Sequence, residues 1–277
     1  VTGLNPIEVY KSMFDGAFSS SRRIWITIRD TMVLLCISIA LAPAFKMKFW
    51  NIGAEGQMLV GGIVTAGIMI YFGNSVPTSV LIVIMLISSI LIGAMWGLLP
   101  AIFKAYWNTN ETLFTLMMNY VAIQLTSFFV AKWENPFGSN TVGIINANTQ
   151  GGWFPAIIGQ PYLLNVIIVL AVMIGMYIYL EKSKQGYEVA VVGESENTAR
   201  YAGINVKWVT IRTMIISGAI CGLEGTNIIS LDEQYRDILG YLPQKFGYYR
   251  NYTPRQFLEY MAALKGLNHS YAKQRIE

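Results

Sequence analysis

The residues best suited to chemistry in this sequence are amides and carboxylates at the starts of long apolar stretches. Glu55 stands within the segment Asn51-Ile-Gly-Ala-Glu-Gly-Gln57, directly before an apolar run. An ionisable side chain in a membrane segment is costly, and it is by default a functional hypothesis. The flanking glycines allow an irregular helix start, and a helix N-terminus favours a carboxylate. Glu55 is therefore either a functional residue or the capped end of a helix that faces cytoplasmic water.

A second polar group opens another apolar stretch. Asn110 and Glu111 fit the N-cap and the first turn of a helix, and Asn119 lies about two turns further along. The side chain of Asn119 could hydrogen-bond a neighbouring helix, which is common in membrane bundles. It could equally line a polar pathway, as could Gln124 in the same stretch.

The same inventory excludes several chemistries. Two cysteines and the single histidine, His269, are too few for an ordinary zinc site, so we expect no metal centre. An intramembrane hydrolase needs Ser/His or paired Asp side chains inside its spans, and no histidine or aspartate lies inside a predicted span. No filter-like loop or charged ring favours a channel. The net charge of +4 is scattered, which argues against nucleic-acid binding.

The composition indicates the elements that must position these residues. Apolar residues make up 54% and charged residues 13% of the 277 residues, whereas a soluble domain carries about 25% charged residues. We therefore predict an all-α polytopic membrane protein with about six transmembrane helices. The predicted spans are Thr31–Phe45, Ile52–Phe72, Pro77–Phe103, Glu111–Ala131, Pro161–Leu180 and Trp208–Gly225.

The loops predict an orientation and one further helix. Lys46, Lys48, Lys104 and the loop Glu181–Lys207 carry more Lys and Arg than the other side, seven against five, which places them in the cytoplasm. Residues 1–30 read as an amphipathic helix at the membrane interface. Within the cytoplasmic loop, a short helix is expected around Ser195–Tyr201. Ser195 or Asn197 could cap it, and Gly203 fits the position just after its end. This helix is either a docking point for a partner or a solvated connector.

Two small-xxx-small patterns indicate close helix packing. They are Gly93-Ala-Met-Trp-Gly97 and Gly218-Ala-Ile-Cys-Gly222, and such spacing lets two helix backbones approach each other.

Four ordered motifs give the sequence a family resemblance over residues 1–225. It resembles the membrane permease of a bacterial ABC importer, in the branched-chain amino acid and simple sugar permease superfamily, and within it the nucleoside branch. The motifs are Gly3-Leu-Asn-Pro6, Asn51-Ile-Gly-Ala-Glu-Gly-Gln57, Asn110-Glu111 with Leu116-Met-Met-Asn-Tyr120, and Gly193-Glu-Ser-Glu-Asn-Thr-Ala-Arg-Tyr-Ala-Gly-Ile204.

The resemblance implies a function and a set of partners. The chain would be the permease for a nucleoside or a similar small polar solute in the plasma membrane, with no enzymatic activity. Its partners would be a second permease, two cytoplasmic ATPases that bind the ATP, and an external lipoprotein; the chain itself would hold no cofactor. Asn51, Glu55 and Gln57 would line or shape the pathway, as would Asn119. Glu188–Ile204 would dock on the ATPase, through the residues Glu188, Gly193, Glu194, Asn197, Arg200, Tyr201 and Gly203.

The last part of the chain has a different character. Residues 225–277 hold 12 of the 36 charged side chains, or about 23% charge against about 11% before them. Residues 228–277 resemble part of an ABC ATPase, through Tyr235–Gln244, Phe246-Gly-Tyr-Tyr249 and Pro254–Leu267. Gln244 would match the glutamine that touches the catalytic magnesium and water in that family. We expect a short polar α/β-like fragment over residues 226–277.

This tail sets the alternative function. In that alternative the chain is an ATPase-bearing transporter whose tail contributes to nucleotide hydrolysis. The sequence contains no Gly-x-x-x-x-Gly-Lys-Ser/Thr segment to cradle phosphates, which argues against hydrolysis by this chain. Six spans would also return the chain to the outside before the tail. A domain boundary near Gly225 that joins two unrelated genes is therefore the expectation.

Overall fold

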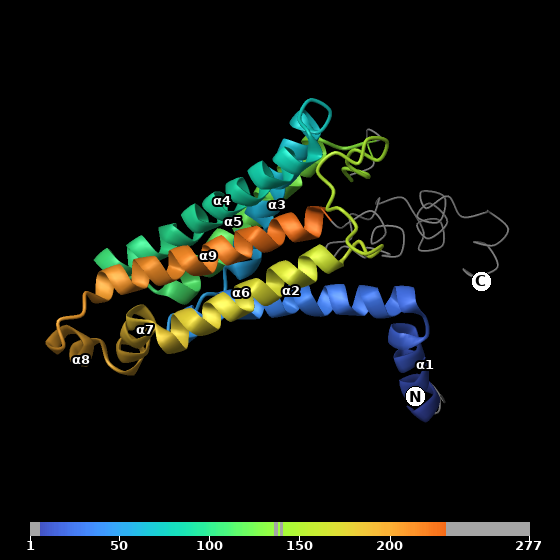
Figure 1. Ribbon diagram of the computed structural model, residues 1–277. Coiled ribbons are helices and arrows are strands. Elements are labelled where there is room, and N and C mark those ends of the chain that lie inside the picture. Colours follow the sequence, from blue (N-terminus) through green and yellow to red (C-terminus); the bar gives the residue numbers. More distant parts are fainter. Residues whose placement is uncertain (1–5, 136–137, 139–140, 231–277) are drawn as a thin grey trace, which may run out of the picture. The chain divides into compact units, whose positions relative to one another are not determined.

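A computed structural model describes residues 6–135, 138 and 141–230. Within these residues every regular element is a helix, which confirms the predicted all-α class (Figure 1). The α/β-like fragment, Gln244 and most of the tail lie outside the described residues. Helix α9 runs through Gly225 without interruption and ends at Ser230.

Six of the nine helices in the described part are long and apolar enough to cross a membrane, which confirms the predicted number of spans. These six are α2 (Ser21–Lys46), α3 (Ala54–Phe72), α4 (Thr78–Trp107), α5 (Glu111–Lys132), α6 (Leu163–Lys182) and α9 (Val206–Ser230). The shorter helices are α1 (Pro6–Phe18), α7 (Lys184–Glu194) and α8 (Glu196–Tyr201).

The first span starts earlier than the sequence suggested. Helix α2 begins at Ser21, whose neighbour Ser20 caps it by accepting a hydrogen bond from the backbone N–H of Arg23 at 3.3 Å. Only α1 remains as a separate helix before it. Of the charges in this part of the span, Arg29 is buried over the ring of Tyr162 at 5.5 Å and pairs with Asp30 at 2.6 Å, whereas Arg22, Arg23 and Asp30 are exposed. Pro43 lies inside α2 without ending it.

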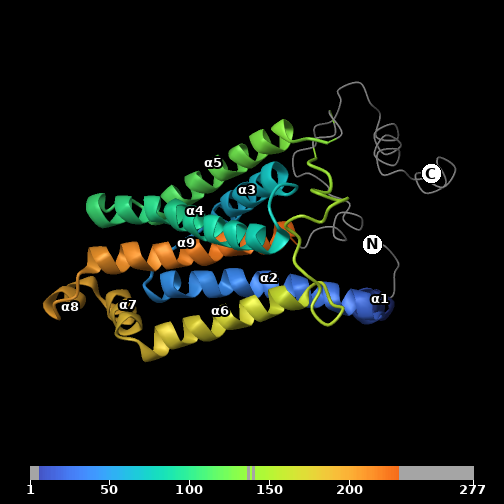
Figure 2. The same cartoon turned by 45° about the horizontal axis from the view of Figure 1, so that its top comes forward.

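Helix α9 occupies the centre of the bundle, where it packs against α2, α3 and α4 (Figure 2). Its glycines explain the close approach of α3 and α4. A Cβ on Gly222 would clash with the carbonyl oxygen of Ser89 in α4, and one on Gly61 of α3 would clash with Gly222. Gly93 and Gly97 of α4 meet Gly218 of α9 in the same way, so both small-xxx-small patterns lie at a close helix contact as predicted, and the structure shows that they contact each other.

The two ends of the bundle differ. Helices α7 and α8 lie beyond α6 and α9 at one end, and we call this the α7–α8 end (Figure 1). Lys46 forms an ion pair with Glu181 there at 2.8 Å, and Lys104 pairs with Glu111 at 2.9 Å. The segments that the charge rule assigns to one side of the membrane therefore do lie at one end of the bundle.

The connection between α5 and α6 closes the opposite end. The side chain of Asn146 donates hydrogen bonds to the carbonyl oxygens of Met69 at 2.8 Å and of Gly151 at 2.9 Å. Met69 lies in the last turn of α3, and its carbonyl oxygen also accepts from the N–H of Gly73 at 3.0 Å, so this amide adds a second hydrogen bond at the helix end. The loop is thus anchored onto the end of α3.

Candidate functional site

The turn before α3 is held inside the bundle by amide side chains. Asn51 and Gln57 are almost fully buried, at 2% and 1% exposure. The amide of Asn51 donates to Gln57 at 3.4 Å and to the hydroxyl of Ser217 in α9 at 3.5 Å, and its oxygen accepts from the N–H of Gly53 at 3.0 Å. These two residues therefore fix the shape of the turn and do not present their side chains at its surface.

Glu55, in contrast, is exposed at the start of α3. The amide of Asn119 in α5 donates to its carboxylate at 3.0 Å. Gly56 permits this approach, because a Cβ there would lie 2.8 Å from the oxygen of Asn119. The structure thus brings Glu55 and Asn119 together from two motifs that are 64 residues apart.

The pair has unused hydrogen-bonding capacity. The oxygen of Asn119 is buried and has no hydrogen-bond partner among the residues described. The carboxylate of Glu55 accepts from Asn119 through one of its two oxygens, and a carboxylate has about four acceptor positions. Because the Asn119 oxygen is buried, the exposed carboxylate of Glu55 is the acceptor of this pair that a solute with O–H or N–H groups could reach.

Asn110 fulfils the predicted N-cap of α5, where its side chain accepts from the N–H of Leu113 at 3.1 Å. The next residue, Glu111, pairs with Lys104 of α4. A second contact comes from Thr115, whose hydroxyl accepts from the N–H of Ile52 at 3.2 Å. The start of α5 is therefore fixed both to α4 and to the turn that precedes Glu55.

The turn is recessed from the α7–α8 end. Gln57 lies beside Gly97, which precedes the end of α4 at Trp107 by ten residues, a rise of about 15 Å. Ser217 lies eleven residues into α9, or about 17 Å from its start. The ends of α4 and α9 thus extend past the turn that carries Glu55.

The short helix predicted around Ser195–Tyr201 is present as α8, and a further helix, α7, precedes it. Ser183 caps α7 by accepting from the N–H of Gly186 at 3.0 Å, and Ser195 caps α8 by accepting from the N–H of Thr198 at 3.3 Å. Ser195 is thus the cap, as one of the two predicted alternatives has it, while Asn197 lies inside α8. Gly203 follows α8 with a φ of +75°, which fits its predicted position.

These two helices have one packed face and one free face. Val189, Val192 and Ala199 belong to a buried cluster with Val209 and Met214 of α9. The opposite side of α8 is exposed, including Tyr201 at 93%. Among the residues predicted to dock a partner, Glu194, Asn197, Arg200, Tyr201 and Gly203 are exposed, whereas Glu188 is half-buried and Gly193 is buried.

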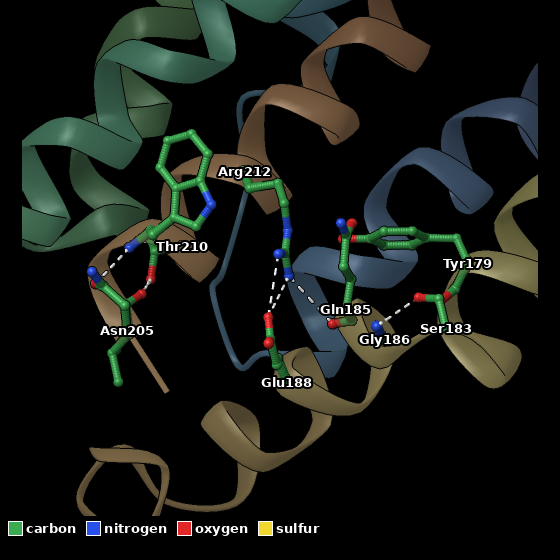
Figure 3. A network of polar contacts seen from close by, with 10 residues as sticks. Tyr179, Ser183, Gln185, Gly186, Glu188, Asn205, Thr210 and Arg212 are labelled. Atoms are coloured by element: carbon green, nitrogen blue, oxygen red, sulfur yellow. Dashed lines mark hydrogen bonds and ion pairs between the residues drawn. The ribbon is translucent and has the colours of Figure 1, made fainter. Parts of the chain in front are cut away.

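The half-buried Glu188 has a different role from its neighbours. Both terminal nitrogens of Arg212 in α9 donate to its carboxylate at 3.2 Å, and one also donates to the carbonyl oxygen of Gln185 at 3.4 Å (Figure 3). Gly193 meets α2, since a Cβ there would clash with the carbonyl oxygen of Lys46. Helix α7 is therefore fixed to both α9 and α2. Helix α8 follows α7 in the chain and packs against it.

Sequence reasoning missed two residues. Arg212 was visible only as a charge near the start of a span, and its partner lies 24 residues away. Glu224 is fully buried in α9, where Asn227 donates to its carboxylate at 3.0 Å. The spacing of these last two, one helical turn apart, is a signal that could have identified the pair.

Comparisons with known proteins agree on the class of protein. The chain is 30% identical over 227 residues to the guanosine ABC transporter permease protein NupP of Bacillus subtilis, covering 81% of this chain and 65% of that protein. It is 30% identical over 231 residues to the nucleoside ABC transporter permease protein NupB of Lactococcus lactis subsp. cremoris, covering 80% and 63%. A third relative, the glucose ABC transporter permease protein TsgB13 of Haloferax volcanii, is 25% identical over 232 residues, covering 80% and 60%.

The chain spans less than two thirds of the length of these curated relatives, and no solved structure gives a significant match. Its six apolar helices and these similarities make it a multi-pass plasma-membrane protein. The family model described as branched-chain amino acid transport system / permease component matches residues 24–235. The chain therefore belongs to this family of transport permeases.

Proposed function

We propose that the chain is the permease subunit of an ABC importer that moves nucleosides, or a similar small polar solute, across the plasma membrane. The observation that carries this proposal is the Glu55–Asn119 pair at 3.0 Å, in which an exposed carboxylate begins a membrane helix of a transport permease. A carboxylate left against lipid would be costly. It is best explained as part of a polar path.

The chemistry of the pair suits the proposed solute. A nucleoside carries ribose hydroxyls and, in most bases, N–H groups. The free acceptor positions of the exposed Glu55 carboxylate would bind such donors, and a hydrogen bond to an ionised group is worth about 1.5–3 kcal/mol. In this proposal Asn51 and Gln57 shape the path from behind, because both are buried.

A second permease subunit would cover this face. Gln124 is exposed on α5 together with Met117, Tyr120, Val121 and Phe128. An exposed amide inside a membrane span is poorly suited to lipid. A path between two permeases would place both Glu55 and Gln124 against protein or water.

The exposed face of α8 would dock a cytoplasmic ATPase, which binds and hydrolyses the ATP. An external lipoprotein would deliver the solute. The chain itself has no catalytic role in this proposal and holds neither a cofactor nor a metal. The similarity to permeases named for guanosine and for nucleosides supports a nucleoside as the proposed solute.

Uptake of radiolabelled guanosine tests the proposal. The chain is expressed with the ATPase, second permease and lipoprotein of its own gene cluster, in cells that lack nucleoside uptake. We expect uptake that a hundredfold excess of unlabelled adenosine or uridine blocks and that glucose leaves unchanged. Uptake blocked by glucose but not by nucleosides would instead favour the sugar permease that the Haloferax volcanii relative suggests.

A further inference from the structure

The ion pair of Arg212 and Glu188 joins the exposed helices of the α7–α8 end to the centre of the bundle. Both side chains are largely buried, at 15% and 19% exposure, so solvent and salt screen the pair weakly. The guanidinium also donates to the carbonyl oxygen of Gln185, so it is hydrogen-bonded both to the Glu188 side chain and to the backbone of α7 (Figure 3). Removing one partner of such an ion pair strongly destabilises the protein, because the other partner is left as an uncompensated buried charge.

The pair acts on a helix pair that already rests on α9. Val189 and Val192 of α7 pack in the buried cluster that contains Val209 and Met214 of α9. Apolar packing is not directional in the way that a hydrogen bond is. The directional hydrogen bonds of Arg212 add the fixed register that the apolar contact lacks.

A short stretch of α9 leads from this pair to the turn before α3. Ser217 follows Arg212 by five residues, a rise of about 7.5 Å along the helix. The hydroxyl of Ser217 accepts from the amide of Asn51, and Asn51 holds the N–H of Gly53. Glu55 comes two residues later.

We propose that Arg212 and Glu188 are positioning residues that transmit movement of the α7–α8 pair to α9, and through Ser217 and Asn51 to the turn that carries Glu55. This inference rests on the proposed function. With the ion pair formed, a displacement of α8 by its partner moves α7 and α9 together. Without it, α7 is held to α9 by apolar contact alone and transmits less of the displacement to the turn.

Transport per ATP tests this inference in the reconstituted importer. The complex is placed in proteoliposomes, and radiolabelled guanosine uptake and ATP hydrolysis are measured together for Arg212→Glu, Glu188→Arg and the double charge swap. We expect each single variant to lower the guanosine moved per ATP at least tenfold. The swap should recover it to within threefold of the wild type. Unchanged transport per ATP in the single variants, or no recovery in a swap that melts like the wild type, would overturn the proposal.

A neutral variant covers the case in which the single variants fail to fold. Arg212→Met with Glu188→Met keeps the bulk and leaves no unpaired charge. It should melt within a few degrees of the wild type and still move at least tenfold less guanosine per ATP. Wild-type coupling in this variant would also overturn the inference. The matched control is the charge swap of Lys46 and Glu181, an exposed pair at the same end, which should stay within twofold.

Amide hydrogen exchange separates this inference from the proposed function. If the wild type takes up no guanosine, the proposed function fails, and exchange in α7 of the purified chain then decides the inference. We expect the amides of Lys184–Glu194 to exchange at least tenfold faster in Arg212→Glu and to return to the wild-type rate in the swap. Exchange that is the same in all three proteins would contradict the proposal.

Discussion

At the scale of single residues, two carboxylates in membrane helices have opposite surroundings. Glu55 is exposed and bonded to Asn119, whereas Glu224 is fully buried and bonded to Asn227. An exposed carboxylate can meet a solute, but a buried one can only serve the fold. We therefore expect substitutions at the two positions to affect different measurements.

For Glu55 the prediction concerns uptake. Glu55→Gln keeps the size and the hydrogen bond from Asn119 but removes the charge, so the loss should match one charge-assisted hydrogen bond, or about tenfold or more in uptake. The melting temperature of the purified protein should stay unchanged. Glu181→Gln is the control, since it neutralises an exposed carboxylate at a helix end, and uptake by Glu55→Gln at the level of this control would remove Glu55 from the mechanism.

For Glu224 the prediction concerns stability. Its second carboxylate oxygen is buried without a hydrogen-bond partner among the described residues. Glu224→Gln keeps an acceptor for Asn227 and replaces a buried ionisable group with a neutral amide, so it should melt at or above the wild-type temperature. Glu224→Ala leaves Asn227 unpaired and should cost about 1–3 kcal/mol. Thermal melting in detergent measures both, and equal destabilisation by the two variants would show that the charge itself is required.

At the scale of helices, the contact of α9 with α4 depends on glycine. The backbones touch at Gly222 and Ser89 and at Gly218 and Gly93, where a Cβ has no room. With larger side chains at these positions, the backbones of the two helices would lie further apart. The central position of α9 follows from these glycines.

The test is a pair of identical substitutions. Gly222→Ala should lower the melting temperature by several degrees, because the new methyl group meets the backbone of α4 and overpacking costs about 1–3 kcal/mol. Gly175→Ala in α6 meets nothing within 4 Å and should be neutral or stabilising, since alanine is the better helix former by about 1 kcal/mol. Similar melting temperatures for the two variants would mean that the close contact is absent.

The helices also show what the sequence could predict. The cap by Asn110, the cap by Ser195 as one of two alternatives, the position of Gly203 and the close packing at the two glycine patterns depend on local spacing, and the structure has them as expected. That the two glycine patterns contact each other was not predictable from either one alone. The predicted start of α2 was wrong by ten residues, and the burial of Arg29 over Tyr162 depends on a distant segment that no local pattern reveals. The Arg212–Glu188 and Glu55–Asn119 pairs likewise join residues far apart in the chain, and no local pattern links them.

At the scale of the molecule, the α7–α8 end and the turn before Glu55 are connected through α9. The exposed α8 is held by α7, α7 is tied to α9 by Arg212, and α9 reaches the turn before Glu55 through Ser217. An importer driven by a separate ATPase needs such a connection. A passive pore does not, because its solute moves without ATP.

The most direct test that ATP hydrolysis drives guanosine transport through this permease is therefore the accumulation of guanosine in sealed vesicles. The complete importer is reconstituted in proteoliposomes with radiolabelled guanosine and the lipoprotein on the outside, and ATP is supplied on the side of the ATPase. We expect the guanosine concentration inside the vesicles to rise above the external concentration when ATP is present and to stay at background when ATP is absent. Equilibration to the external concentration without ATP would contradict the account and identify a passive pathway, and no uptake in either condition would contradict the proposed solute.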